Sequence, residues 1–356
     1  MISDGFFNEK KILVTGHTGF KGTWLSVWLS MLGAEVYGYS LYPSRDQKFE
    51  LTKINRVYSS EMFSDVRDLE ALTNSVSSIQ PDFIFHLAAQ SLVPFSFESP
   101  HDTWTTNLLG TINVLESLRS IKNRCTVVLI TSDKVYENKE WFWGYRETDQ
   151  LGGIDPYSAS KAGAELAIRS YIKTFFFNQD RIRIAVARAG NVIGGGDWSE
   201  KRIVPDCIRS WSDGKSVELR NPLSTRPWQH VLEPLSGYLN LSTKLYHDIL
   251  IHGEAFNFGP REDQNKTVLS LVKEMSKHMR GATFTEVVQK DTKLLESGLL
   301  KLSIDKAESL TQWRPRWSFE KTVRETMLWY KHHKDGDNES IMNLMRSQIN
   351  DYNKDC

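Results

Sequence analysis

The sequence predicts an α/β protein in which helices cover both faces of a parallel sheet. Short apolar runs alternate with longer amphipathic segments up to residue 190, which is typical of βαβ units. A glycine-rich turn follows the first apolar run, and the alternation stops after Gly190. Together these observations favour a doubly wound sheet of the Rossmann type with a smaller, discontinuous C-terminal lobe.

The elements are expected in a regular order. Apolar runs predict strands at 11–16, 35–41, 82–89, 126–132 and 181–190, and helical spacing predicts helices at 22–32, 69–79, 105–121 and 157–176. Further helices are expected at about 232–249, 268–279 and 318–334. We expect the Rossmann domain to comprise 1–189 and 226–256, and the lobe 190–225 and 257–356. Loops 191–202 and 219–230 are rich in Gly, Pro and Arg, which is typical of segments that carry binding groups.

Composition describes an ordinary globular protein. Lys plus Arg and Asp plus Glu both number 44, so no charge excess predicts a nucleic acid or an anionic membrane as partner. No run reaches the roughly 18 apolar residues of a membrane span, and the first residues lack a signal-peptide core, so we expect a cytoplasmic protein. Cys125, Cys207 and Cys356 are too few and too far apart for a disulfide framework or a metal cluster. No metal is expected.

The turn after the first strand reads GHTGFKG at residues 16–22. Glycines there let the backbone approach a pyrophosphate, which the N–H groups of the following helix attract. The ribose-binding acid expected about 20 residues later is missing, since the second strand ends at Ser40 and the nearest acid is Asp46, beside Arg45. This rule therefore does not decide between NAD and NADP. Asp65 either contacts the adenine or caps the helix that follows it.

Tyr157 and Lys161 lie four residues apart at the start of a predicted helix, which places them on one face. An ammonium and a cofactor cation can stabilise the phenolate of a nearby tyrosine. The pair therefore suits removal of a hydroxyl proton while a hydride leaves the same carbon for NAD. The strand 126–132 ends in Ser132, Asp133 and Lys134, and these three residues form either a solvated loop or part of the same site.

Seven blocks of sequence carry a family resemblance: TGHTGFKG, HLAAQ, TTNLLGTINVLE, TSDKVY, DPYSASKAGAE, RAGNVIGGGDW and RPWQHVLEP. Between about residues 10 and 330 the chain resembles the extended short-chain dehydrogenase/reductase family. Within that family it is most similar to the nucleotide-sugar 4,6-dehydratases, and in particular to the branch that uses CDP-glucose. The resemblance implies a tightly held NAD, a nucleotide-sugar substrate in the C-terminal lobe, and a role in deoxysugar synthesis for lipopolysaccharide O-antigen.

The resemblance also implies catalytic roles. Tyr157 would take the proton of the sugar 4-hydroxyl, with Ser132 bonded to the same oxygen and Lys161 holding the phenolate. Asp133, kept protonated, would give a proton to the departing 6-hydroxyl. Lys134 occupies the position of the base that removes the C5 proton, and it acts either as a neutral amine or as an ammonium that stabilises the enolate. Glu137 is a weaker candidate for this base.

Ligand contacts are implied for many further positions. Resemblance assigns the substrate to Gln90, Ser132, Arg188, Asn191, Arg202 and Arg226, although each arginine by itself would be typical of a solvated surface. Pro94 and Phe95 stand where a basic residue is expected. The resemblance also implies a homodimer formed through the helices 105–121 and 157–176, or a homotetramer. The cofactor is assigned to Gly16, Thr18, Gly19, Phe20, Lys21, Gly22, Ser40, Asp65, Val66, Leu87, Ala88, Ala89, Asn107, Tyr157 and Lys161.

Two other functions fit part of the pattern. A nucleotide-sugar 4-epimerase shares the fold, the Tyr–Lys pair and NAD, but its reaction has no need of an acid at Asp133. A non-catalytic dinucleotide sensor has no use for Ser132, Tyr157 and Lys161 together.

Overall fold

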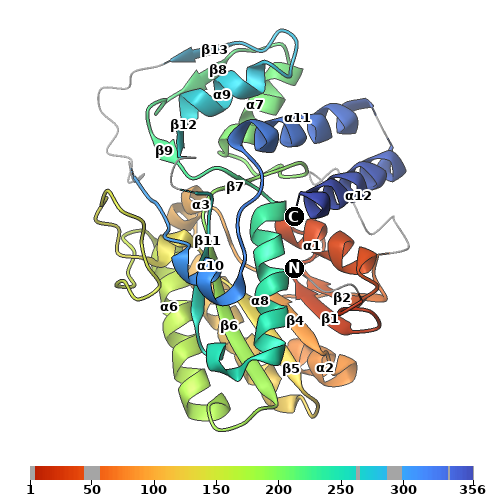
Figure 1. Cartoon of the computed structure of the whole chain (residues 1–356). Helices are drawn as coiled ribbons and strands as arrows, with labels where there is room; N and C mark the ends of the chain where they lie inside the picture. The colour runs from red at the N-terminus through yellow and green to blue at the C-terminus, as the bar shows by residue number, and fades with distance from the viewer. Residues whose placement is uncertain (1–4, 44–56, 262–264, 287–298, 336, 356) are drawn as a thin grey trace.

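The computed structural model describes residues 5–43, 57–261, 265–286, 299–335 and 337–355 (Figure 1). A seven-stranded sheet lies at its centre, in the order β11-β6-β5-β4-β1-β2-β3, and every neighbouring pair of strands is parallel. The order 3-2-1-4-5-6 of the first six strands is that of a doubly wound Rossmann sheet. The predicted fold class is confirmed.

All five predicted strands are present and slightly shorter than expected, whereas β3 and β11 were not predicted. The four-residue edge strand β3 reads SEMF and is mostly exposed, so it lacks the apolar run that marks a buried strand. The strands of the sheet are β1 (Lys11–Thr15), β2 (Glu35–Ser40), β3 (Ser60–Phe63), β4 (Phe83–His86), β5 (Cys125–Ile130), β6 (Ile182–Ala189) and β11 (Ala255–Phe258).

Helices cover both faces of the sheet. Alternate residues of each strand point to opposite faces, and they enter two separate hydrophobic clusters. The helices of one face are α2 (Leu69–Ile79), α5 (Gly110–Ser117) and α6 (Pro156–Tyr171), and those of the other are α1 (Phe20–Met31) and α8 (Leu232–His247). Trp24 and Trp28 are buried in the second cluster. Helix α12 (Asn338–Lys354) lies beside α1, and α11 (Phe319–Asp335) packs against α12 (Figure 1).

The helix expected at 105–121 is interrupted. Helix α4 (Pro100–Trp104) continues into a π-helical turn at Thr105–Leu109, then into α5 and a 3-10 turn at Leu118–Ser120. A second π turn, Ile172–Phe176, follows α6. π turns are frequent at functional sites, and the first one carries Asn107.

The smaller part of the molecule lies at the top of Figure 1, above the sheet. It contains α7 (Ile203–Ser212), α9 (Val268–Ser276), and the strand pairs β8–β13, β9–β12 and β7–β10. Helix α10 (Asp305–Thr311) instead packs against β11 and α8. The division into two domains at the predicted boundaries stays a prediction. The short strands are β7 (Val192–Ile193), β8 (Val217–Leu219), β9 (Thr225–Arg226), β10 (Gln229–His230), β12 (Lys266–Thr267) and β13 (Phe284–Glu286).

Candidate active site

The glycine turn between β1 and α1 has no room for side chains at two positions. Gly16 has φ of +74°, and a Cβ there would lie 2.7 Å from the backbone N of Ala88. A Cβ on Gly22 would lie 2.1 Å from the carbonyl oxygen of Gly16. Helix α1 begins after Gly19 without a side-chain cap, so its first N–H groups are available to an anion. These residues fit a dinucleotide pyrophosphate.

At the predicted adenosine end of the cofactor site, Asp65 pairs with an arginine and does not cap the next helix. Its carboxylate accepts hydrogen bonds from the Arg67 side chain at 2.7 and 2.9 Å, while the carboxylate of Asp68 caps α2. The helix-capping alternative for Asp65 is therefore wrong. Thr18 and Ser40, both predicted cofactor contacts, meet at 2.9 Å between their hydroxyl oxygens. Arg45 and Asp46 lie outside the described residues.

Asn107 ties the loop after β4 to α6. Its side-chain amide donates to Ser160 Oγ at 2.9 Å and to the carbonyl of Gln90 at 3.0 Å, and its Oδ1 accepts from the Gln90 backbone N–H. The side chain of Gln90 bonds within the same segment, to the Leu92 carbonyl and to Thr103 Oγ1. Both residues thus shape the wall that also contains the predicted cofactor contacts Leu87, Ala88 and Ala89.

Tyr157 and Lys161 are fixed by the start of α6. Asp155 caps the helix by accepting from the Ser158 backbone N–H at 2.9 Å, and both site residues are buried. Lys161 Nζ donates to the carbonyl of Ile130, at the end of β5. Burial raises the pKa of Tyr157 to about 12 and lowers the pKa of Lys161 to about 8. Without further positive charge, Tyr157 is therefore a protonated phenol at neutral pH.

The segment after β5 is buried, so the solvated-loop interpretation is wrong. Asp133 is 3% exposed and begins a 3-10 turn. Ser132 Oγ donates to Asp133 Oδ1 at 3.0 Å and accepts from the Lys134 N–H at 3.2 Å. Within the described parts of the chain, Asp133 Oδ2 has no hydrogen-bond partner, and neither a hydrogen bond nor an ion pair engages the Lys134 ammonium. Glu137 is exposed and lies 3.8 Å from the Lys139 amine.

Lys21, which is half-buried, brings a second amine to this centre. Its pKa is lowered to about 8, chiefly by desolvation and also by the charges of Arg202 and Lys161, while that of Asp133 acts in the opposite direction. The amine lies 6.0 Å from the centre of the Tyr238 ring. Sequence reasoning missed Tyr238, whose buried hydroxyl has no hydrogen-bond partner among the residues described, because its place in an apolar helix gave no chemical signal.

The predicted substrate arginines have different surroundings. The Arg188 side chain is 1% exposed and forms an ion pair with Glu165, so its guanidinium is not accessible to a phosphate, contrary to the substrate role expected for it. Arg202 is partly exposed, and bonds to Asp197 at 2.8 Å and to Ser91 at 3.2 Å.

Two further predicted substrate residues follow β6. Arg226 is buried in β9, where it donates to the Thr225 carbonyl. The Asn191 carbonyl accepts from the Gln229 N–H at 3.2 Å, and Asn191 is half-buried. Substrate contacts of both residues stay predictions.

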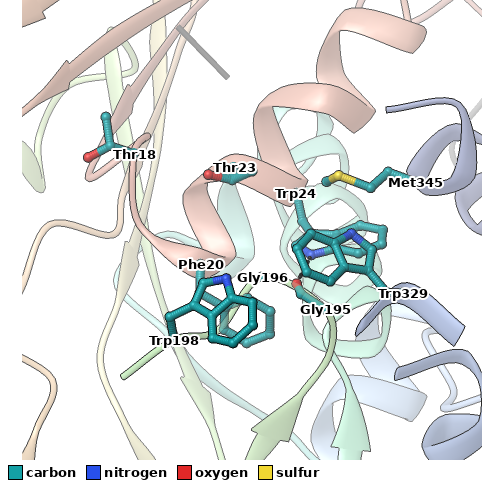
Figure 2. Close-up of a pocket in the computed structure, with 9 residues that line it drawn as sticks. All are labelled: Thr18, Phe20, Thr23, Trp24, Gly195, Gly196, Trp198, Trp329 and Met345. Carbon is teal, nitrogen blue, oxygen red and sulfur yellow. Dashed lines mark hydrogen bonds between the residues drawn. The ribbon is translucent and has the colours of Figure 1, made fainter. Parts of the chain in front are cut away.

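Gly195 and Gly196 in loop 191–202 pack against Trp329. A Cβ on Gly195 would lie 1.9 Å from Cγ of Trp329, and the Gly195 carbonyl accepts from the Trp24 indole at 2.9 Å. Figure 2 shows the aromatic pocket that results, with Trp24, Trp198 and Trp329 around the two glycines Gly195 and Gly196. The loop is therefore held against the C-terminal helices, and its Arg202 end projects toward the site.

The described residues contain no group of three or more His, Cys, Asp or Glu arranged to hold a metal ion. In the same residues, none of the helices has the length and apolar character required to cross a membrane.

Comparisons with known proteins agree with this geometry. The chain is 43% identical to the CDP-glucose 4,6-dehydratase of Salmonella typhimurium, over 99% of this chain and 98% of that protein. A crystal structure of the dTDP-glucose 4,6-dehydratase of Bacillus anthracis in complex with NAD has a TM-score of 0.75 at 23% identity, covering 92% of this chain and 98% of the other. A UDP-glucose 4-epimerase from Thermotoga maritima has a TM-score of 0.77 at 21% identity, covering 91% and 99%.

The family profile described as GDP-mannose 4,6 dehydratase matches residues 13–326. This match covers the glycine turn, the segment after β5, the Tyr–Lys helix and most of the second lobe. With its parallel Rossmann sheet and its buried Ser132, Asp133, Tyr157 and Lys161, the chain belongs to the GDP-mannose 4,6-dehydratase family of nucleotide-sugar dehydratases.

Proposed function

We propose that the protein is a CDP-glucose 4,6-dehydratase, which converts CDP-glucose to CDP-4-dehydro-6-deoxyglucose and water. The observation that carries this proposal is the buried Asp133 beside Ser132 and Tyr157, with one carboxylate oxygen left without a partner in the described structure. Oxidation at C4 needs only the Tyr–Lys pair, whereas elimination of water needs an acid as well. The 43% identity to the Salmonella enzyme supports the choice of nucleotide.

The cofactor would be NAD, held at the turn of Gly16, Gly19 and Gly22 and at the N-terminus of α1. When bound, it accepts a hydride from C4 of the sugar and later returns one to C6. The Thr18–Ser40 contact and the segment Asp65–Val66 would border its adenosine end. Phe20, Lys21, Leu87, Ala88, Ala89 and Asn107 would border the rest.

Tyr157 would remove the proton of the 4-hydroxyl. Since burial raises the pKa of this phenol to about 12, it becomes a base only where positive charge stabilises the phenolate. Lys161 supplies one such charge, because its pKa of about 8 leaves most of it protonated at neutral pH. Ser132 would hold the same sugar oxygen.

Asp133 and Lys134 would act in the elimination of water across C5 and C6. The 4-ketone acidifies the C5 proton, which Lys134 would accept or help to remove. Asp133, in its protonated form, would donate to the departing 6-hydroxyl from Oδ2. Lys134 suits this place because no partner in the described residues engages its amine.

Arg202, Arg226 and Asn191 would contact the nucleotide and its diphosphate. Arginine forks form charge-assisted bonds to phosphate, and Arg202 is close enough to the centre to act on the pKa of Lys21. Gln90 would border the sugar through the loop that it stabilises.

The direct test is incubation of the purified protein with NAD and, separately, CDP-glucose, UDP-glucose, dTDP-glucose and GDP-mannose. We expect a 4-keto sugar, detected by its absorbance in alkali, with CDP-glucose only. A product with another nucleotide would overturn the base assignment, and interconversion of C4 epimers without loss of water would identify an epimerase instead. Absence of any reaction with all four substrates would refute the dehydratase.

A homodimer, or a homotetramer built from two, would bury the exposed apolar side chains of the helices before and after the catalytic segment. These include Trp104 and Leu109 on one side and Leu166 and Phe175 on the other, and contiguous exposed apolar surface marks association sites. Sedimentation should show a dimer or larger species that Leu166→Glu converts to a monomer. A wild-type monomer would contradict this.

We place the reaction in the cytoplasm, in deoxysugar synthesis for lipopolysaccharide O-antigen. A 4-keto-6-deoxy sugar nucleotide is reactive at C4, which suits it to later reductases or aminotransferases. Deletion of the coding sequence should remove the corresponding deoxysugar from the polysaccharide, and an unchanged sugar composition would contradict this placement.

A further inference from the structure

A buried ion pair lies next to the catalytic segment. Glu165 on α6 and Arg188 on β6 are both almost completely buried, with side chains 4% and 1% exposed. Arg188 Nε donates to Glu165 Oε1 at 2.8 Å, and Arg188 Nη2 donates to Glu165 Oε2. The fork of a guanidinium on a carboxylate fixes both distance and plane.

Each member of the pair also binds one end of the catalytic segment. Thr131, just before Ser132, donates its hydroxyl to Glu165 Oε1 at 2.7 Å. The hydroxyl oxygen of Tyr136, two residues after Lys134, accepts from Arg188 Nη1 at 2.7 Å, and the guanidinium also lies over the Tyr136 ring.

The network continues to the edge of the sheet. The Tyr136 hydroxyl donates to Asn257 Oδ1 at 2.7 Å, and the Asn257 side-chain amide donates to the carbonyls of Tyr145 and Ser303. Arg188 also donates to the Glu147 carbonyl at 3.2 Å. The polar groups of this buried network are thus matched to one another, as rigid networks require.

We propose that Glu165 and Arg188 form a positioning pair that fixes the segment 131–136, with Ser132, Asp133 and Lys134, against the helix that carries Tyr157 and Lys161. Glu165 lies one helical turn beyond Lys161 on the same helix, so the pair joins the groups assigned to C4 with those assigned to C5 and C6. Neither residue touches the substrate in this proposal, which rests on the proposed dehydratase function.

The pair also has an electrostatic consequence for Lys161. The charge of Glu165 raises the pKa of Lys161 against the larger lowering effect of burial. The Lys161 charge acts in turn on two other titratable groups: it lowers the pKa of Lys21 on α1, and it adds to the burial that lowers the pKa of His86 on β4 to about 3, so that this imidazole is neutral. Glu165 is thus the anion that helps to keep Lys161 protonated.

Glu165→Gln keeps the shape of the side chain and removes its charge. Labelling of Lys161 by cyanate is measured by mass spectrometry as a function of pH. We expect the pH of half-maximal labelling to fall by roughly one unit in this variant. The exposed Lys215 is an internal control whose labelling profile should not move. An unchanged Lys161 profile would overturn the electrostatic part of the proposal, and this measurement needs no substrate.

The positioning role is tested by the double variant Glu165→Leu/Arg188→Met. Replacing a whole buried ion pair by apolar residues often preserves stability, so the unfolding midpoint should stay close to that of the wild type. Because the segment has lost both anchors, kcat for 4-keto sugar formation should fall by roughly ten- to a hundredfold with little change in KM. Wild-type kcat in this folded variant would overturn the positioning role.

Thr131→Val serves as a second variant if the double variant does not fold. It removes one hydroxyl of the anchor with almost no change in volume, and we expect a several-fold loss of kcat and an unchanged Lys161 labelling profile. Full wild-type kcat in Thr131→Val would contradict the role of this anchor. If the wild-type protein makes no 4-keto sugar, the proposed function fails, while the labelling of Lys161 still tests the pair.

Discussion

Tyr157 and Lys161 lie on a capped helix, whereas Asp133 and Lys134 lie in a single 3-10 turn. Lys161 already bonds to the Ile130 carbonyl. In contrast, Asp133 Oδ2 and the Lys134 amine lack partners within the described residues. The groups proposed to act at C4 are thus held by the fold itself, whereas the polar atoms proposed to act at C5 and C6 would gain their partners only when the substrate binds.

The largest loss of activity is expected from a change at Tyr157, on the helix. Tyr157→Phe removes the hydroxyl that takes the C4 proton, so 4-keto sugar formation should fall by roughly a thousandfold. Exchange of the C5 proton with solvent deuterium should disappear too, because no ketone forms. Circular dichroism controls for folding. More than a tenth of the wild-type rate would show that another group is the base.

Asp133→Asn should separate oxidation at C4 from the elimination of water. The amide cannot supply the proton for the departing hydroxyl, so product formation should fall by roughly a hundredfold or more. Because Tyr157 and Lys134 remain, CDP-glucose recovered from deuterated water should still carry deuterium at C5. An epimerase would tolerate this change, so a near-normal rate would argue against elimination at Asp133.

Variants of Lys134 should show which of two roles this residue has in removal of the C5 proton. Lys134→Met should lower elimination by roughly tenfold to a hundredfold and abolish deuterium exchange at C5. If Lys134 is the base, Lys134→Glu keeps a base in place and should retain elimination. If the ammonium instead stabilises the enolate, Lys134→Glu should be worse than Lys134→Met. A methionine variant with most of the wild-type rate would exclude both roles.

The pH dependence of kcat/KM should reflect Lys161. Burial lowers its pKa to about 8, so the amine is charged below that pH and loses its proton as the pH rises through it. Stabilisation of the Tyr157 phenolate is then lost, and the rate should fall on the alkaline side by about tenfold per unit. Lys161→Arg, which stays charged, should lack this decline. A wild-type rate that keeps rising well above pH 8 would contradict the assignment.

The smallest effect is expected from removal of the Asp155 cap of helix α6, which carries Tyr157 and Lys161. Asp155→Ala removes the acceptor for the Ser158 N–H and should lower the free energy of unfolding by about 1 kcal/mol. Asp155→Asn, which can still accept, is the matched control and should lose less. Equal losses in chemical denaturation would show that the carboxylate charge, rather than the hydrogen bond, matters.

Local patterns in the sequence were sufficient to predict the alternating fold, the glycine turn and the Tyr157–Lys161 pair. All three depend on residues close together in the chain. Arg188 could not be placed in this way, because its burial depends on Glu165 and Tyr136, which come from other elements. Similarly, nothing local in the sequence shows that Trp329 fills the space beside Gly195 in loop 191–202.

Edge strand β3 and the π turn at Asn107 were missed for a related reason. A strand of only four residues, mostly exposed, gives no periodic signal, and a π turn has the same residue types as the α-helix around it. Their positions follow from pairing with β2 and from the bonds of Asn107 to Ser160 and Gln90.

Trp329 in helix α11 contacts Gly195, in the loop that carries the proposed phosphate ligand Arg202. Helices α11 and α12 serve as a rear support for the loop that carries Asp197 and Arg202, since Tyr330 also donates its hydroxyl to the Asp197 carbonyl. Changes at the C-terminus, such as a shortened last helix or a fused tag that disturbs it, would therefore reach the proposed phosphate contacts. They would do so without altering any residue that meets the sugar.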